Sequence, residues 1–339
     1  MLLMTRLLYI GNKLNSKTSN VSSIDALVPL FEAEGYTLYY ASSKINKVLR
    51  LCDMLIACIR YRNRVDFVII DTYSTLNFNY ALLVSQLCRI LHLKYIPSLN
   101  GGNLPKRLKE NPYLCGLIFN HAYKNVSPSL FLKESFEYFG YTNIGYIPNT
   151  IELEKYPFKT RQFTRVRLFW VRAFSKIYNP LLAIKTLKVL QDDGIDASLC
   201  MVGPDSDGTL KDAKKLAKQL NVAVQFTGKL TKAEWIDLAQ GYNIFINTTN
   251  FDNMPVSVVE AMALGLVVIS TNVGGMPYLI KHKQDGILVK PNDVDAFVSA
   301  IKDIIKSPET AASVAIHARQ KFEQYDWTIV KQLWRTTLQ

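Results

Sequence analysis

Short apolar runs alternate with longer segments of helical periodicity, and this alternation limits the folds that the chain can adopt. The runs at 6–11, 65–71 and 167–171 are rich in aliphatic and aromatic residues, as are strands buried on both faces of a sheet. Segment 45–59 repeats apolar residues at every third or fourth position, as an amphipathic helix does. Strands that alternate with helices predict βαβ units and doubly wound parallel sheets, so we expect an α/β protein.

The alternation restarts after a break at 157–167, which divides the chain into two halves. A chain of 339 residues corresponds to about two domains of ordinary size. We therefore expect two Rossmann-like domains, over 1–157 and 165–321, that face each other across a cleft. In doubly wound sheets ligands bind beyond the carboxyl ends of the strands, so functional residues are expected there.

The chain is basic, with 40 Lys and Arg against 28 Asp and Glu and a net charge of +12. The excess is concentrated at 44–64, where Asp53 is the single acid, and at 89–109, which contains no acid. Such clusters suit the phosphates of a nucleotide, a nucleic acid or an anionic lipid, or they form a solvated surface. No signature of a nucleic-acid-binding fold is present, so we expect no nucleic-acid partner. The apolar stripe of 45–59 would suit an anionic membrane surface, or it packs against the core.

Several catalytic and binding motifs are absent from the sequence. No G-x-G-x-x-G follows the first strand and no G-x-x-x-x-G-K-[ST] occurs, which argues against classical dinucleotide and P-loop sites. The four histidines are isolated and the five cysteines form no C-x-x-C pair, so we expect no metal site and buried thiols in a reducing, cytoplasmic compartment. No apolar run reaches the ~18 residues of a membrane span.

Segment 247–291 is the most informative part of the sequence for function. It predicts a strand, a loop that carries Asp252, a helix that begins near Pro255 and a further strand before Gly274-Gly275. The N–H groups at such a helix start, with the helix dipole, form an anion site. Carboxylates at Asp252 and Glu260 bracket this site and can accept hydrogen bonds from sugar hydroxyls, so the segment suits a nucleotide sugar. The alternatives are an Asp252 that caps its own loop, a solvent-facing Glu260 and glycines that only form turns.

This segment resembles the signature of glycosyltransferase family 4, whose members have the GT-B fold and are usually metal-independent and retaining. The family pattern is E-G-x-P, E-A-M-A-x-G-x-P-V-I, G-G-x-P-E and G-x-L-V, and the matching positions are 252–255, 260–269, 274–278 and 286–289. Further matching positions are 147–149, 202–203, 227–230 and 325–327. The resemblance implies that a C-terminal helix at about 322–339 crosses back to complete the N-terminal, acceptor-binding domain, whereas 165–321 binds the nucleotide sugar.

The resemblance also implies roles for individual residues. Arg172 and Lys176 would offset the charge that develops on the departing diphosphate, the alternative being an ordinary ion pair. Glu260 would hold the ribose and Asp252 the donor sugar. The other residues implied in donor binding are Gly11, Gly203, Lys229, Leu230, Asn253, Met254, Pro255, Val256, Ser257 and Val258.

The sequence departs from the family pattern at two informative positions. Asn100 stands where many members carry a His near the reacting centre, and Tyr278 stands where a Glu is usual. An Asn side chain can hydrogen-bond a sugar but cannot titrate near neutral pH, which weakens any role for a side-chain base there. Asn100 remains a candidate catalytic residue, with Gly101 and Gly102 on the acceptor side.

The sequence therefore predicts a retaining, metal-independent glycosyltransferase without a cofactor, for which a UDP- or GDP-linked sugar is a substrate. The acceptor would be a hydroxyl of a glycan or of a polyprenyl-diphosphate-linked precursor in polysaccharide or glycolipid synthesis. We expect the protein in the cytoplasm, peripheral at the inner face of the plasma membrane through 44–64 and 89–109. The alternatives are another GT-B enzyme such as an epimerase, disfavoured because few titratable residues are expected at the strand ends, and a non-catalytic nucleotide-sugar-binding protein.

Overall fold

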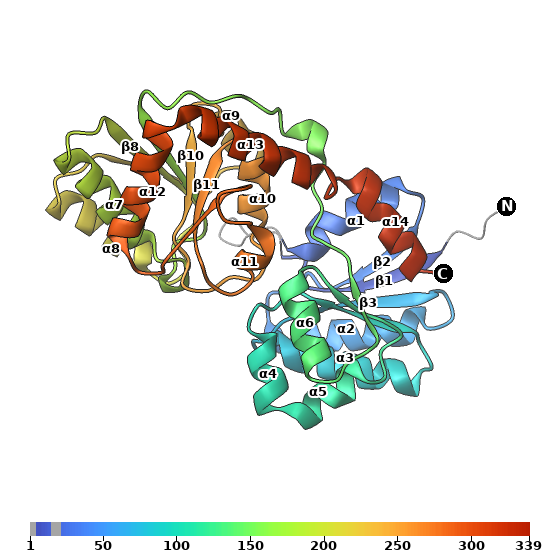
Figure 1. Ribbon diagram of the computed structural model, residues 1–339. Helices are drawn as coiled ribbons and strands as arrows, with labels where there is room; N and C mark the ends of the chain where they lie inside the picture. The colour runs from blue at the N-terminus through green and yellow to red at the C-terminus, as the bar shows by residue number, and fades with distance from the viewer. Residues whose placement is uncertain (1–4, 15–21) are drawn as a thin grey trace. The chain divides into compact units, whose positions relative to one another are not determined.

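The computed structural model describes residues 5–14 and 22–339, which form two compact units (Figure 1). One unit comprises the chain up to Asn149 together with Thr328–Gln339, and the other comprises Thr150–Trp327. The division therefore falls before the segment in which the sequence led us to place it. The reason is packing: Tyr156 and Phe163 are buried in the cores of the second unit, and Arg161 donates hydrogen bonds to the main chain of that unit.

The first unit is a six-stranded parallel sheet with helices on both faces. The strand order is β2-β1-β3-β4-β5-β6. The strands are β1 (Arg6–Ile10), β2 (Thr37–Ala41), β3 (Phe67–Thr72), β4 (Tyr95–Leu99), β5 (Asn125–Ser127) and β6 (Ile144–Tyr146). The helices are α1 (Ser23–Ala33), α2 (Lys47–Tyr61), α3 (Asn77–Ile90), α4 (Leu104–Glu110), α5 (Pro112–Phe119), α6 (Leu130–Tyr138) and α14 (Trp327–Thr337).

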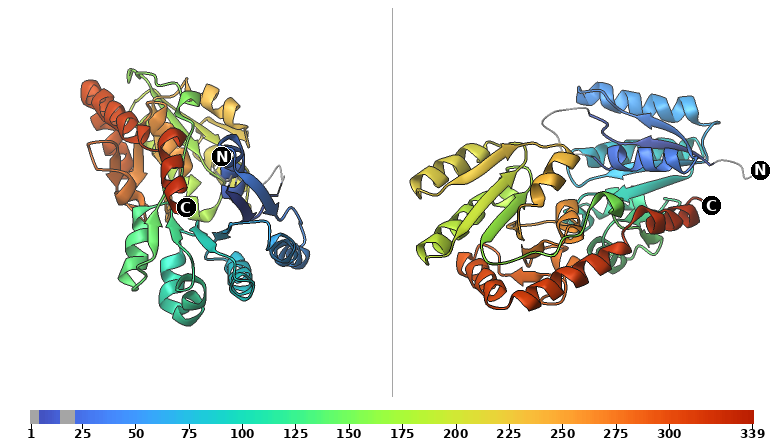
Figure 2. Two further views of the ribbon diagram at one scale, coloured as in Figure 1. Left: turned by 90° about the vertical axis from the view of Figure 1, so that its right-hand side faces the viewer. Right: turned by 90° about the horizontal axis from the view of Figure 1, so that it is seen from above.

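The C-terminal helix α14 completes this first unit by packing beside α1 (Figures 1 and 2). The Glu34 carboxylate, at the end of α1, accepts hydrogen bonds from Lys331 at 2.8 Å and from Arg335 at 2.7 Å. The hydrogen bond from Lys331 is the main cause that lowers the pKa of Glu34. The rings of Phe31 and Trp334 meet edge to face, with their centroids 5.3 Å apart. A segment almost 300 positions away in sequence is therefore part of the first unit.

The second unit repeats the same plan with a strand order of β12-β11-β10-β7-β8-β9, again all parallel. Its strands are β7 (Val166–Val171), β8 (Ala197–Val202), β9 (Val224–Gly228), β10 (Ile244–Asn247), β11 (Val267–Thr271) and β12 (Ile287–Val289). Its α-helices are α7 (Pro180–Asp192), α8 (Thr209–Gln219), α9 (Lys232–Ala239), α10 (Val256–Ala263), α11 (Met276–Leu279), α12 (Val294–Lys306) and α13 (Pro308–Glu323). Two short 3-10 helices are η1 (Leu153–Lys155) and η2 (Lys176–Tyr178).

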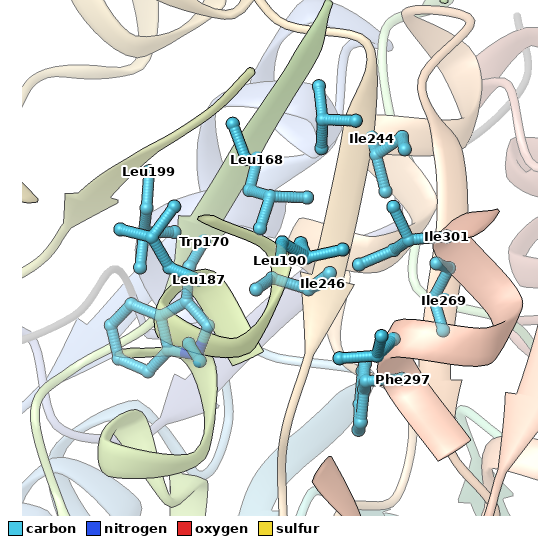
Figure 3. Close-up of a cluster of buried hydrophobic side chains, with 14 of the residues drawn as sticks. Leu168, Trp170, Leu187, Leu190, Leu199, Ile244, Ile246, Ile269, Phe297 and Ile301 are labelled. Atoms are coloured by element: carbon cyan, nitrogen blue, oxygen red, sulfur yellow. The ribbon is translucent and has the colours of Figure 1, made fainter. Parts of the chain in front are cut away.

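Side chains that alternate along the strands form separate cores on the two faces of the second sheet. On one face Leu168 and Trp170 of β7 pack with residues of α7 and α12, such as Leu187 and Phe297 (Figure 3). On the other face Phe169 packs with residues of α9, α10 and α13. The two buried faces explain why these strands read as continuous apolar runs. The two Rossmann-like parallel sheets confirm the α/β fold class that the sequence predicts.

The order of the strands reverses once in each sheet, between β1 and β3 and between β7 and β10. Loops that leave neighbouring strands at such a switch point run in opposite directions and leave space for ligand-binding side chains. Gly11 follows β1, Arg172 follows β7, and the loop with Asp252 follows β10. The fold thus places sequence-predicted residues at both switch points.

Because Phe297 is fully buried in the second unit, we predict that Phe297→Ala lowers the free energy of unfolding by about 3–5 kcal/mol. The volume-conserving Phe297→Leu should lower it by under about 1.5 kcal/mol. Urea unfolding followed by fluorescence measures both effects. Ile316→Ala, at an exposed position of α13, is the control. An equal loss in Phe297→Ala and Ile316→Ala would contradict the assigned core.

Candidate functional site

The Arg172 guanidinium forms an ion pair with the Asp252 carboxylate at the switch point of the second unit. The side chains are only 16% and 12% exposed. The guanidinium also lies over the Tyr178 ring, 4.4 Å from its centroid. Burial lowers the pKa of Arg172, while Tyr178 and Glu260 raise it, and an Arg side chain keeps its proton in proteins. The sequence left open whether Arg172 serves the leaving group or only forms an ion pair. The structure shows such an ion pair, and its partner Asp252 is itself a candidate site residue.

Side-chain hydrogen bonds hold the two loops that carry this ion pair. Trp170 Nε1 donates to the Thr248 hydroxyl at 3.0 Å, and that hydroxyl donates to the Tyr178 carbonyl at 2.9 Å. The Asn250 N–H donates to the Ile177 carbonyl at 2.7 Å. The loop after β10 therefore fixes η2, the short helix that places Tyr178 beside Arg172.

Lys176 begins η2, with a fixed main chain and an exposed side chain. Its N–H donates to Asp207 at 3.0 Å, and its carbonyl accepts a hydrogen bond from Asn250 Nδ2 at 3.1 Å. Lys176 therefore lies on the same loop as Arg172, and hydrogen bonds hold the main chain of this loop in place. Its ammonium group faces solvent, where it can meet a charged ligand.

Three glycines allow main-chain segments to approach closely around the ion pair. A Cβ at Gly274 or Gly275 would overlap the carbonyl oxygen of Asp252 or Asn253, and the Gly275 N–H donates to the Asp252 carbonyl at 2.9 Å. Gly203, after β8, has a φ of 149°, and a Cβ there would overlap the Arg172 carbonyl. Turn formation alone therefore does not explain these glycines, because each is needed for loop-to-loop packing.

Glu260 lies in α10 with only 3% of its surface exposed, so the alternative of a solvent-facing residue is wrong. Its Oε1 atom accepts a hydrogen bond from the Tyr156 hydroxyl at 2.6 Å and pairs with the Lys232 ammonium. Burial, reinforced by Glu260, raises the pKa of Tyr156, so the phenol stays protonated. No described residue donates to Oε2, which leaves that oxygen for a ligand.

The start of α10 offers main-chain donors next to this carboxylate. Pro255 is the N-cap, so the helix begins at Val256, one residue later than expected. The N–H groups of Val256 and Ser257 have no acceptor in the described ranges, whereas the Val258 N–H already donates to the Pro255 carbonyl at 3.1 Å. The Val258 side chain is fully buried and belongs to the core. Asn253 and Met254 are buried in the preceding loop, where the Asn253 N–H donates to its neighbour Asp252 at 2.9 Å. Asp252 thus makes one local hydrogen bond within its own loop in addition to its ion pair.

Gly203, Lys229 and Leu230 follow the neighbouring strands β8 and β9. The Gly203 N–H donates to the Gly228 carbonyl at 2.8 Å, which joins the two strand ends. Leu230 packs against the core that contains Trp235, and Lys229 is exposed. These residues thus share one sheet edge with Arg172.

The predicted residues of the first unit gather around a carboxylate that the sequence interpretation missed. Asn100 Nδ2 donates to Asp71 Oδ1 at 2.9 Å, and a Cβ at Gly11 would lie 2.6 Å from Asp71 Oδ2. A Cβ at Gly101 would lie 2.5 Å from the Ser74 nitrogen, so this loop also needs a glycine, and Gly102 next to it is half-buried. Burial raises the pKa of Asp71 to about 7. The expectation that titratable groups are scarce at the strand ends was wrong here.

The site residues that the sequence interpretation missed differ in how clearly the sequence marks them. Asp71 is an acid at the end of a buried strand, which is a usable signal. Thr231 and Glu234 form a capping box that marks the start of α9 beside Lys232. Tyr156 and Tyr178 carry no signal, because their roles depend on contacts with residues far away in sequence.

Helix α2 presents most of its apolar stripe to solvent, whereas Leu55 of the stripe packs against the core. Ile45, just before the helix, is 88% exposed, and Val48 and Leu49 are 69% and 60% exposed. The other exposed apolar residues of α2 and the adjoining α3 are Ile56, Ile59, Leu83 and Ile90. These seven residues are called the α2–α3 surface below. The core-facing alternative is therefore wrong for the exposed residues of the stripe.

Two of the basic residues assigned to this region are not part of its surface. Arg50 is only 7% exposed and donates to the carbonyls of Lys44 and Ile45. Arg107 lies over the Phe78 ring and donates to the Ser74 carbonyl at 3.0 Å. The exposed cations of segments 44–64 and 89–94 are Lys44, Lys47, Arg60, Arg62, Arg64, Arg89 and Lys94.

The described residues contain neither a cluster of metal-ligating side chains nor a membrane-spanning helix. Across residues 5–14 and 22–339, His, Cys, Asp and Glu side chains form no group of three or more that could hold a metal ion. None of the helices in the same ranges has the length and apolar character needed to cross a membrane.

Sequence comparison relates the second unit to known glycosyl transferases. Residues 154–321 match the family model for glycosyl transferases group 1. A sulfoquinovosyl transferase of Arabidopsis thaliana is 30% identical over 152 residues, which cover 43% of this chain and 28% of the relative. An Escherichia coli UDP-Gal:alpha-D-GlcNAc-diphosphoundecaprenol alpha-1,3-galactosyltransferase is 25% identical over 175 residues, which cover 47% of this chain and 44% of the relative. The matches thus span less than half of each of these relatives, and the likeness to group 1 glycosyl transferases is concentrated in the second unit.

Structural comparison extends the likeness to both units. HepE of Anabaena, solved with UDP and glucose, has a TM-score of 0.78 at 15% identity, over 98% of this chain and 99% of that chain. A sucrose-phosphate synthase of Thermosynechococcus elongatus has a TM-score of 0.79 at 15% identity, over 98% of both chains. At this identity the likeness establishes the fold, which is GT-B as the sequence resemblance implies.

We predict that Gly203→Ala destabilises the second unit more than Gly194→Ala does. Both glycines have positive φ, so each substitution strains the backbone by about 1 kcal/mol. Only the Cβ at Gly203 would also overlap the Arg172 carbonyl, whereas nothing lies within 4 Å of a Cβ at Gly194. Thermal unfolding compares the two variants. An equal loss of thermal stability in the two variants would show that the overlap with the Arg172 main chain does not affect stability.

Proposed function

We propose that the protein is a retaining glycosyltransferase of family 4 that uses a nucleotide-diphospho-sugar. The observation that carries this proposal is the grouping of Arg172, Asp252, Glu260 and the start of α10 at the switch point of the second unit. Cations, main-chain N–H groups and carboxylates are the three kinds of group that a diphosphate joined to two sugars requires. The group 1 family match over the same unit agrees with this chemistry.

In this proposal the donor diphosphate replaces Asp252 as the partner of Arg172. The phosphate oxygens also accept hydrogen bonds from the Val256 and Ser257 N–H groups, where the dipole of α10 favours negative charge. Glu260 Oε2 accepts from the ribose hydroxyls, while Tyr156 and Lys232 hold Oε1. Asp252, released from its ion pair, accepts from a hydroxyl of the donor sugar.

The reaction breaks the bond between the anomeric carbon and the diphosphate oxygen and forms a bond to the acceptor hydroxyl oxygen on the same face of the sugar. The acceptor proton passes to the departing diphosphate, so no side-chain base is required. Arg172, with Lys176 beside it, stabilises the charge that develops on the leaving group. We propose that these cations perform this task without a metal ion.

The same site and the relatives support a proposal for the substrates. A UDP- or GDP-linked sugar is the donor, and the structure of HepE with UDP and glucose supports the UDP form. The acceptor is a glycan or a polyprenyl-diphosphate-linked precursor, since the Escherichia coli relative is named for an acceptor of that kind. In this proposal the protein acts at the cytoplasmic face of the membrane that holds such an acceptor.

We predict distinct kinetic effects for two site variants, measured with UDP- and GDP-sugars in the presence of EDTA. Glu260→Gln weakens donor binding roughly 10- to 100-fold, because a hydrogen bond to a charged group contributes about 1.5–3 kcal/mol. Arg172→Gln lowers kcat by about 100-fold or more, because its charge acts mainly on the leaving group. Arg165→Gln, in an exposed ion pair with Asp196, is the matched control and stays near wild type.

Four outcomes would count against the proposal. Epimer formation from the donor would favour an epimerase, and donor binding without turnover with any acceptor would favour a non-catalytic binding protein. Loss of activity in EDTA would contradict metal independence. An inverted anomeric configuration in the product would contradict the retaining mechanism.

The same enzyme docks on an anionic membrane through the α2–α3 surface. The two helices pack against each other, and the Tyr80 hydroxyl donates to the Lys47 carbonyl at 3.0 Å. Apolar side chains on both helices are exposed, and the same segments carry exposed Lys and Arg side chains. An apolar surface bordered by Lys and Arg fits a bilayer with anionic lipids, because insertion and electrostatic attraction then act together.

We predict that the protein floats with vesicles of anionic phospholipid at low salt, and that Ile56→Glu with Ile59→Glu abolishes this binding. The introduced charges remove apolar area and repel the lipid headgroups. Ile316→Glu, at an exposed apolar position in the second unit, is the control and retains binding. Binding falls at 1 M salt, where the Debye length is about 3 Å. Equal binding to neutral vesicles, or no binding at low salt, would contradict the membrane claim.

A further inference from the structure

A cluster of buried polar side chains lies at the switch point of the first unit. Asp71, near the end of β3, is 6% exposed. Its Oδ1 atom accepts hydrogen bonds from the Tyr9 hydroxyl at 3.0 Å and from Asn100 Nδ2 at 2.9 Å. Its Oδ2 atom is buried, and no described residue is its hydrogen-bond partner. A small pocket lined by Gly11, Tyr73 and Asn77, among others, adjoins this carboxyl group.

This cluster determines which way the Asn100 amide faces. A carboxylate oxygen only accepts hydrogen bonds, so the nitrogen of the amide must face Asp71. The carbonyl oxygen of Asn100 then lies on the opposite side of the amide, and nothing in the described ranges donates to it. Asn100 is half-buried, so this oxygen is accessible to a hydroxyl group of a bound molecule.

We propose that Asp71 is a positioning residue whose carboxylate holds the Asn100 amide so that the carbonyl oxygen meets a hydroxyl of the acceptor. The ionised carboxylate binds two donors strongly, because hydrogen bonds to a charged acceptor are about twice as strong as neutral ones. A proton on Asp71 weakens both hydrogen bonds and loosens Asn100. The identity of the ligand as an acceptor rests on the proposed function, whereas the coupling between Asp71 and Asn100 does not.

The surroundings of Asp71 bring the protonation of its carboxylate near neutral pH. Burial is the main cause that raises the pKa of Asp71 to about 7, and Asp25 of α1 acts in the same direction. The hydrogen bonds from Tyr9 and Asn100 oppose the shift. Tyr73, the other titratable group that faces the carboxyl, stays neutral because burial raises its pKa. Asn100 is therefore held firmly above pH 7 and loosely below it.

The direct test is the NMR spectrum of the side-chain amide of Asn100 in the full chain labelled with 15N-asparagine. The signal is assigned by its loss in Asn100→Ser. We expect it to shift with a midpoint near pH 7 in the wild type and to stay constant in Asp71→Asn. Asp66→Asn, which removes an exposed carboxylate of the same unit, is the matched control and leaves the titration unchanged.

A second variant keeps the test decisive if Asp71→Asn does not fold. Tyr9→Phe removes a hydrogen bond that lowers the pKa of Asp71, so the midpoint of the Asn100 signal moves to higher pH. A signal that does not titrate between pH 5 and 9, or that titrates equally in Asp71→Asn, overturns the coupling. An unchanged midpoint in Tyr9→Phe also overturns it.

Kinetics then test the link to the acceptor. The KM for the acceptor should rise several-fold as the pH falls from 8 to 6 in the wild type and stay flat in Asp71→Asn, while donor affinity is the same in both. A titrating Asn100 signal with an acceptor KM independent of pH would refute the role in acceptor binding. If no sugar is transferred from any donor, the proposed function fails, and the NMR titration still decides whether Asp71 positions Asn100.

Discussion

The buried ion pair between Arg172 and Asp252 joins two loops that the strand order brings together at β7 and β10. The Arg172 guanidinium lies over the Tyr178 ring, and the two side chains are only 16% and 12% exposed. Removing one partner of a buried ion pair leaves the other charge buried without a counter-charge, and this strongly destabilises the folded protein. A ligand that separates the pair must therefore supply charge of its own, and the diphosphate of a nucleotide sugar does so.

Both units place a buried carboxylate at the point where strand order reverses, but they surround it differently. Asp252 faces the permanent positive charge of Arg172, whereas Asp71 faces the neutral donors of Tyr9 and Asn100. Burial disfavours the ionised form of Asp71, and because no cation in the described ranges pairs with it, its pKa rises to about 7. The same topology thus gives one site suited to a charged ligand and one suited to a neutral, hydroxyl-bearing ligand.

The parts of the fold that the sequence predicts are those with local signals. The strands at β1, β3 and β7 and the amphipathic α2 were recognised because their apolar patterns repeat within each segment. The short strands β5 and β6 were missed because three residues carry too little pattern. Glu260 and Arg172 were found through a motif, but their partners Tyr156, Tyr178 and Lys232 depend on tertiary contacts. The sequence also showed the stripe of α2 without showing whether it faces the core or solvent.

The central claim is that the second unit binds an activated sugar where Arg172 and Asp252 now pair. A crystal structure of the protein with UDP tests it most directly. The account predicts that the diphosphate lies at the start of α10, that the ribose contacts Glu260, and that Arg172 has turned from Asp252 to a phosphate oxygen. UDP bound elsewhere, or an Arg172–Asp252 pair that remains intact beside bound UDP, would contradict it.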